Sequence, residues 1–169
     1  MNALVASAVF LVIAPGVVAG LVPWWITRWQ MQPAFFGVSS LRLAGLLLIA
    51  IGSVGLLDSF RRFAVEGFGT PAPILPTSQL IVSGLYRYVR NPMYVAVLGV
   101  IFGQALLLGS ASLLLYGGVV WVAFHAFVLT YEEPTLLRAY GEQYRNFCAR
   151  VPRWIPRLPH FPRLPHFLR

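Results

Sequence analysis

Charged side chains are scarce in this sequence of 169 residues. Asp, Glu, Lys and Arg together make up 11% of the chain, whereas 58% of it is hydrophobic and the mean hydropathy is +0.72. Soluble domains usually contain about 25% charged residues. The composition therefore excludes an ordinary soluble domain and predicts an all-α integral membrane protein that forms one membrane domain.

Lysine is absent: all 13 basic residues are arginines, against five acidic residues, which gives a net charge of +8. A basic balance of this size can indicate nucleic-acid binding. In an apolar chain whose arginines fall in the predicted loops and tail, the positive-inside rule explains them with fewer assumptions. We therefore expect membrane lipids, and no nucleic acid, as partners.

Cysteine is almost absent, because Cys148 stands alone and an intramolecular disulfide is excluded. No cluster of His, Cys and Asp has the spacing of metal ligands, so we expect no metal. The first residues, Met1 to Leu4, also lack the basic stretch of a signal peptide. We therefore interpret the first apolar run as a retained membrane anchor.

Four apolar runs are predicted to cross the membrane, which takes roughly 20 residues for about 30 Å of hydrocarbon. They cover residues 3–22, 41–60, 93–108 and 111–131, and the first ends in Pro23-Trp24-Trp25. Only a Gly109-Ser110 junction separates the last two, which predicts a tight antiparallel hairpin. The patterns at residues 16–20 and 99–103, each Gly-x-x-x-Gly, permit close helix contact, the second within this hairpin.

Residues 61–91 are predicted to form a cytoplasmic loop, because five Gly and Pro residues between 67 and 76 rule out a continuous helix. After the fourth run, residues 134–150 carry apolar side chains at spacings of three and four, typical of an interfacial amphipathic helix. We expect residues 132–156 to cover the cofactor as a lid. Residues 157–169, which belong to a duplicated Pro-rich hexapeptide, should form a basic strap on anionic headgroups.

The arginines predict the orientation. Four spans put the 61–91 loop and both termini on one side, with four arginines in the loop and seven from Arg138 onward; only Arg28 and Arg42 fall on the other side. The positive-inside rule makes the richer side cytoplasmic. We therefore expect cytoplasmic N- and C-termini, with the protein in the inner (plasma) membrane of a bacterium.

Residues 84–94 form the most unusual stretch, with two arginines, an asparagine, a proline and three tyrosines directly before an apolar run. Pro92 suits the first turn of a helix and Asn91 suits its N-cap. A second polar cluster, Tyr131-Glu132-Glu133, closes the next apolar run. Arginine and tyrosine are also ordinary interface anchors, but two facing helices would bring both clusters to one level, which predicts a site.

These motifs resemble those of the isoprenylcysteine carboxyl methyltransferase family and of phospholipid methyltransferase-like membrane enzymes. The family's Gly-x-Tyr and Arg-His-Pro-x-Tyr correspond to residues 84–86 and 90–94. Its Glu-Glu-x-x-Leu, aromatic-Gly-x-x-Tyr and Val-Pro-x-x-Ile-Pro correspond to residues 132–136, 140–144 and 151–156. The resemblance covers about half of the chain and implies a methyltransferase that uses S-adenosyl-L-methionine.

The resemblance also implies a cofactor pocket, and the chemistry agrees with it. Tyrosine rings can stabilise a sulfonium cation by about 0.5–2 kcal/mol, a carboxylate can bind an ammonium or a ribose hydroxyl, and aliphatic side chains can form a wall for adenine. The predicted pocket residues are Ser78, Gln79, Leu80, Ile81, Tyr86, Arg90, Asn91, Pro92, Met93, Tyr94, Glu132 and Glu133.

Two positions depart from the family pattern and bear on the methyl acceptor. Asn91 replaces the usual histidine, and Val128 stands where eukaryotic members carry an arginine implicated in prenylcysteine binding. We expect a lipophilic acceptor that arrives from the bilayer, as in isoprenylcysteine carboxyl O-methylation. A phospholipid amine or a small thiol is the alternative, and a non-catalytic membrane subunit or carrier is a more distant one.

Two polar residues lie within the apolar runs. His125 precedes Glu132 by about two helical turns, so it is a candidate catalytic base or acceptor ligand, with a helix-bridging hydrogen bond as the alternative. Gln104 is better explained as a contact between helices.

Overall fold

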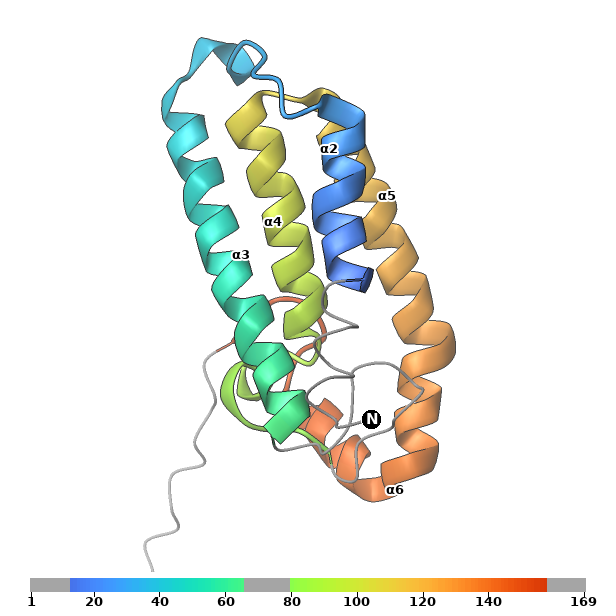
Figure 1. The fold of residues 1–169 in the computed structure, drawn as a ribbon. Helices are drawn as coiled ribbons and strands as arrows, with labels where there is room; N and C mark the ends of the chain where they lie inside the picture. Colours follow the sequence, from blue (N-terminus) through green and yellow to red (C-terminus); the bar gives the residue numbers. More distant parts are fainter. Residues whose placement is uncertain (1–12, 66–79, 158–169) are drawn as a thin grey trace, which may run out of the picture.

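The computed structural model describes residues 13–65 and 80–157, and every regular element within these ranges is helical (Figure 1). The first helix, Ile13–Thr27, contains a π-helical turn, η1 (Val17–Leu21), and α2 (Val22–Thr27). The others are η2 (Phe35–Gly37), α3 (Ser40–Val65), η3 (Gly84–Arg87), α4 (Pro92–Leu108), α5 (Ala111–Phe127), η4 (Val128–Glu132) and α6 (Glu133–Arg150). The predicted helical fold is confirmed; the predicted strap beyond residue 157 lies outside the described residues.

Two helical stretches are long and apolar enough to cross a membrane, Ser40–Arg62 and the continuous stretch Ala111–Arg150, while Ile13–Thr27 and Pro92–Leu108 are shorter. Many large apolar side chains of α3 are exposed, among them Leu43, Ile51 and Val54. An outward apolar surface of this kind is what a lipid environment favours, because lipid tails are as apolar as leucine.

The predicted hairpin of α4 and α5 is confirmed. Pro92 opens α4, where its missing N–H costs no helical hydrogen bond. Gly109 ends the helix with a φ of 72°, a left-handed conformation that favours glycine. The Ser110 side chain then accepts a hydrogen bond from the Leu113 N–H and caps α5. The two helices therefore run antiparallel with a two-residue connection.

Glycines bring α4 closest to α3, and not to α5 as the sequence suggested. A Cβ on Gly103 would lie 2.7 Å from the Gly45 carbonyl oxygen, and one on Gly52 would lie 2.7 Å from the Ala96 oxygen. Both distances are shorter than real Cβ contacts. The pattern at residues 99–103 was thus correctly interpreted as a packing motif, but its partner helix was wrong, because small residues on α3 complement it.

The first helix does not end before Pro23 as predicted; it continues to Thr27. Pro23 cannot donate a hydrogen bond to a carbonyl in the preceding turn, and the Val22 N–H bonds to Val17 in the π-helical manner. The carbonyls of Val18 and Ala19 instead accept hydrogen bonds from neighbouring helices, from Tyr116 Oη at 2.8 Å and Gln104 Nε2 at 2.7 Å. The contact predicted for Gln104 is confirmed.

Two more boundaries differ from the prediction. The helix α3 runs on to Val65, so residues 61–65, assigned to the loop, are helical; residues 66–79 of that loop lie outside the described residues. The predicted polar helix at 134–150 is present as α6, but Gly141, at φ 53° and ψ −123°, kinks it. The apolar side chains before and after Gly141 therefore do not form one continuous helical face.

Candidate functional site

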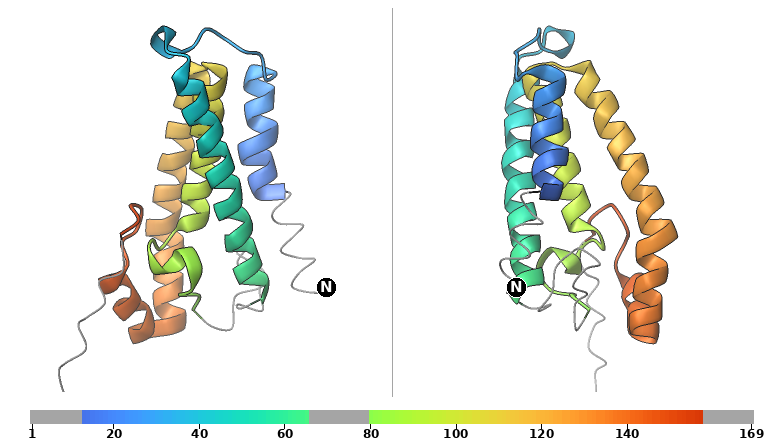
Figure 2. Two further views of the ribbon diagram at one scale, coloured as in Figure 1. Left: turned by 90° about the vertical axis from the view of Figure 1, so that its left-hand side faces the viewer. Right: turned by 45° about the vertical axis from the view of Figure 1, so that its right-hand side comes forward.

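The residues singled out from the sequence gather at one end of the bundle. The end of α3, the turn η3, the start of α4 and the helix α6 lie near one another at the lower end of Figure 1, and the two views of Figure 2 agree. The C-terminal segment, residues 151–157, follows α6 and contacts the loop before α4: the Arg90 N–H donates to the Pro152 carbonyl at 2.9 Å and the Arg157 N–H to the Tyr88 carbonyl at 3.1 Å.

Tyr94 and Glu132 join the two predicted polar clusters. Tyr94 lies in the first turn of α4, and its hydroxyl donates a 2.7 Å hydrogen bond to Glu132 Oε2. Both side chains are half-buried. Glu132 ends the π-helical turn η4, two residues before Pro134 near the start of α6, and π-helical turns are frequent at functional sites. The juxtaposition of tyrosine and acid that the sequence predicted is therefore present.

Tyr86 adds a second phenol to this pair. It lies in the turn η3 and is buried next to Ser59 of α3, within electrostatic range of Glu132. Burial, and then the Glu132 carboxylate, raise the pKa of Tyr86 well above its usual value, while its hydrogen bond with Ser59 opposes the rise. The phenol is therefore neutral at physiological pH and offers a polarised O–H and an aromatic face.

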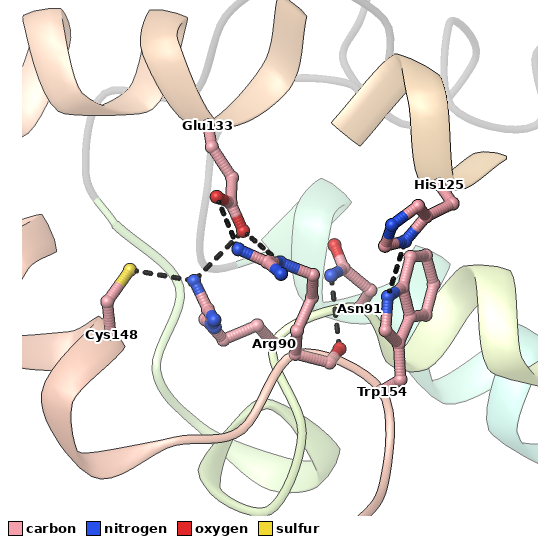
Figure 3. A network of polar contacts seen from close by, with 7 residues as sticks. Arg90, Asn91, His125, Glu133, Cys148 and Trp154 are labelled. Atoms are coloured by element: carbon pink, nitrogen blue, oxygen red, sulfur yellow. Dashed lines mark hydrogen bonds and ion pairs between the residues drawn. The ribbon is translucent and has the colours of Figure 1, made fainter. Parts of the chain in front are cut away.

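Glu133 binds two arginines in a network that Figure 3 shows. Arg153 contacts it in a bidentate manner, Nε to Oε1 at 2.6 Å and Nη2 to Oε2 at 3.0 Å, and Arg90 Nη1 reaches Oε1 at 2.9 Å. Bidentate arginine–carboxylate pairs fix geometry as well as charge. The hydrogen bond from Arg153 to Glu133 raises the pKa of the guanidinium. Arg90 also donates to Cys148 Sγ at 3.0 Å. Through Glu133 and Cys148 on α6, and Arg153 on the C-terminal segment, the network connects both elements to Arg90.

Asn91 occupies the predicted N-cap position of α4, but its side chain makes no capping hydrogen bond. Its Nδ2 instead donates to the Arg153 carbonyl at 3.1 Å (Figure 3). The prediction of the position is confirmed and that of the capping bond is wrong: the amide is oriented so that its Nδ2 donates to the C-terminal segment. Asn91 is buried between α4 and this segment.

His125 lies on α5 beside the C-terminal segment. Trp154 Nε1 donates to His125 Nδ1 at 3.1 Å (Figure 3), and the Trp121 ring stacks on the imidazole with centroids 5.4 Å apart. The indole N–H can only donate, so Nδ1 is the acceptor of this bond. The Trp154 ring is a neighbour of both side chains, with its centroid 5.9 Å from that of His125 and 6.5 Å from that of Tyr94.

The remaining predicted pocket residues precede α4 or lie in its first turn. Ile81, Pro92 and Met93 are buried and Leu80 is half-buried, whereas Ser78 and Gln79 lie outside the described residues. Four neighbours were not predicted from the sequence: Ser59, Arg62, Arg153 and Trp154. Of these, Arg153 and Trp154 fall inside a motif that was recognised, in its variable positions, which is the signal that could have identified them.

The geometry thus defines an apolar helical protein with a polar site at one end, where two phenols and a half-buried carboxylate meet beneath a fastened C-terminal segment. Such a set can bind a small cation or accept hydrogen bonds from ammonium and hydroxyl groups.

The chain belongs to the phospholipid methyltransferase family, whose model matches residues 41–143. It is 37% identical over 81 residues to a protein-S-isoprenylcysteine O-methyltransferase of Schizosaccharomyces pombe, a match that covers 47% of this chain and 34% of the relative. A phosphatidylethanolamine N-methyltransferase of Phaeosphaeria nodorum is 32% identical over 118 residues, 66% of this chain and 12% of the relative. An Arabidopsis thaliana protein-S-isoprenylcysteine O-methyltransferase B is 34% identical over 79 residues, 46% of this chain and 40% of the relative. The chain therefore matches well under half of the length of each relative.

Proposed function

We propose that this chain is a membrane methyltransferase that transfers a methyl group from S-adenosyl-L-methionine to a lipophilic acceptor, in the manner of isoprenylcysteine carboxyl O-methyltransferases. The observation that carries the proposal is the hydrogen bond between Tyr94 and Glu132, 38 residues apart. This bond connects the motif at residues 84–94 with the acidic motif at residues 132–136, and both motifs resemble those of membrane methyltransferases.

The residues present fit such a cofactor. Glu132 has a carboxylate with one donor, Tyr94, and lone pairs left for an ammonium or a ribose hydroxyl. Tyr86 and Tyr94 offer aromatic faces for a sulfonium, and Ile81 and Met93 supply apolar surface for an adenine. We assign Arg90, Asn91 and Glu133 to shaping this pocket, because their polar groups engage other parts of the chain.

When bound, the cofactor supplies an electrophilic methyl group on a sulfonium. The residues of the chain then act mainly by alignment, which can contribute on the order of 7–11 kcal/mol to such a displacement. The neutral phenols hold a cation without adding a competing nucleophilic anion, and the buried surroundings exclude water. A carboxylate or thiolate acceptor needs no general base; for an amine, the imidazole of His125 is a candidate, through Nδ1 once the bond with Trp154 is released.

The acceptor class follows from the position of the site at the end of an apolar bundle. We infer four membrane spans: the two longer stretches and the two shorter helices Ile13–Thr27 and Pro92–Leu108. We also infer that the site lies at the cytoplasmic surface. Val128 is buried and carries no charge for an acceptor carboxylate. A phospholipid amine is therefore the second candidate acceptor, supported by the phosphatidylethanolamine N-methyltransferase among the relatives.

The test combines binding with transfer. The purified full chain, in detergent or nanodiscs, is titrated with S-adenosylhomocysteine and then incubated with methyl-labelled S-adenosylmethionine and three acceptors: a farnesylated cysteine, phosphatidylethanolamine and a small alkyl thiol. We expect saturable binding and label in the farnesylated cysteine as its methyl ester. Label in phosphatidylethanolamine or in the thiol would show that this compound, and not a prenylated cysteine, is the acceptor. Saturable binding without any transfer would contradict the enzymatic proposal in favour of a subunit or carrier, and so would the absence of binding.

A further inference from the structure

We infer that Arg62, on the helix α3, is a positioning residue for the cofactor site, and that it acts by fixing the turn η3 that carries Tyr86. This inference rests on the proposed function. It assigns a role to a helix that holds none of the motif residues, in the half of the chain where the sequence showed only an apolar span.

Arg62 is held in place from its own helix. Its Nε donates to Asp58 Oδ2 at 2.9 Å, an ion pair one helical turn apart, with side chains 20% and 27% exposed. Ion pairs at this spacing stabilise a helix only slightly. The pair therefore serves better to orient the guanidinium than to stabilise α3.

The guanidinium lies directly on the loop that leads to Tyr86. Arg62 Nη1 donates to Ser83 Oγ at 2.9 Å. Gly84, the first residue of η3, has a φ of 52°, and a Cβ added there would overlap the Arg62 guanidinium. The guanidinium thus occupies the space beside the Gly84 backbone, and a lysine ammonium would not reproduce this planar group.

The same helix end also holds the other side of the turn. Ser59, completely buried, hydrogen-bonds with the phenol of Tyr86. Arg62 therefore contacts η3 at Ser83 and Gly84, and Ser59 contacts it at Tyr86, two residues after Gly84. Rotation of the turn would move the Tyr86 ring relative to Glu132, which is why we expect the loss of Arg62 to weaken cofactor binding and not acceptor binding.

The test compares Arg62→Ala with Arg61→Ala, a matched control because Arg61 is the exposed neighbour with the same charge. Affinity for S-adenosylhomocysteine is measured by calorimetry on the full chain, beside the thermal unfolding midpoint. We expect Arg62→Ala to weaken affinity on the order of tenfold, the lower end for groups that orient a ligand-binding side chain, and Arg61→Ala to change it less than twofold. In turnover assays the KM for the cofactor should rise and that for the acceptor should not.

Two further variants separate positioning from stability. Arg62→Lys keeps the charge and can keep the Asp58 ion pair, but lacks the planar group beside Gly84, so it should fold and still bind more weakly. In a cycle with Tyr86→Ala, the double variant should be no weaker than Tyr86→Ala alone, because Arg62 acts through that ring.

Equal affinities of the Arg61 and Arg62 variants, or effects of Arg62 and Tyr86 that multiply, would overturn the positioning role while leaving the proposed function intact. Failure of the unaltered chain to bind S-adenosylhomocysteine would instead contradict the proposed function, and with it the basis of this inference.

Discussion

The bond between Tyr94 and Glu132 allows a quantitative test of the proposed cofactor site. Removing one partner of a hydrogen-bonded charge pair costs about 2–5 kcal/mol when the pair is buried, and Glu132 is only half-buried. We therefore take the lower end, about 2 kcal/mol, for the loss of its charge opposite a cofactor ammonium. At 1.4 kcal/mol per factor of ten, Glu132→Gln should weaken the affinity for S-adenosylhomocysteine by about thirtyfold.

Tyr94→Phe removes the hydroxyl that donates to this carboxylate and keeps the ring. A hydrogen bond to a charged group contributes about 1.5–3 kcal/mol, and its lower value corresponds to a loss of affinity of about tenfold. Because the hydroxyl acts through the carboxylate, the double variant should be about thirtyfold weaker, like Glu132→Gln alone, and not about three-hundredfold weaker, as independent effects would give.

Calorimetric titration of the purified chain measures all three affinities. Glu142→Gln is the matched control, since Glu142 is an exposed acid on α6 that pairs with exposed Arg145, and it should leave the affinity within about twofold because exposed pairs contribute little. Unchanged affinity in Glu132→Gln would show that the carboxylate does not contact the cofactor. Multiplying effects of the two changes would show that Tyr94 contacts it independently.

Two further predictions concern packing and the histidine. Gly103→Ala should lower stability by about 1–3 kcal/mol, measured as thermal unfolding in detergent, whereas Gly118→Ala should not, since a Cβ there meets no atom within 4 Å; equal midpoints would mean that α3 and α4 can separate freely. His125→Gln should lower kcat by less than tenfold, because Nδ1 already accepts from Trp154. A loss above about a hundredfold, the scale of general base catalysis, would make His125 the base.

The helix boundaries that proline and glycine determine could be predicted from the sequence. Pro92 and the Gly109-Ser110 junction mark the ends of α4 and the start of α5 because their backbone constraints are local. The first apolar run was predicted to reach only residue 22, but the helix continues through Pro23, because side chains from α4 and α5 satisfy the carbonyls that the proline leaves free. That compensation comes from residues 85 and 98 positions away, which no local pattern contains.

Which helix a glycine pattern faces could not be predicted for the same reason. The pattern at residues 99–103 was compatible with either neighbour of α4, and the choice of α3 depends on Gly45 and Gly52 opposite it. The juxtaposition of Tyr94 with Glu132 could be predicted, since motifs at the open ends of two helices of a tight hairpin lie on the same side of the bundle. The contributions of Ser59 and Arg62 were missed because α3 reaches the site only through tertiary packing.

The two motifs divide their polar residues between two tasks, and their order in the sequence does not reveal the division. Glu132 faces Tyr94 and retains capacity for a ligand, whereas its neighbour Glu133 is bound by Arg90 and Arg153. Successive helical residues point about 100° apart, so adjacent carboxylates cannot both face one pocket. In the proposed function Glu132 therefore binds the ligand, whereas Glu133 holds the C-terminal segment, and a substitution at Glu133 should act on the site indirectly, by releasing that segment.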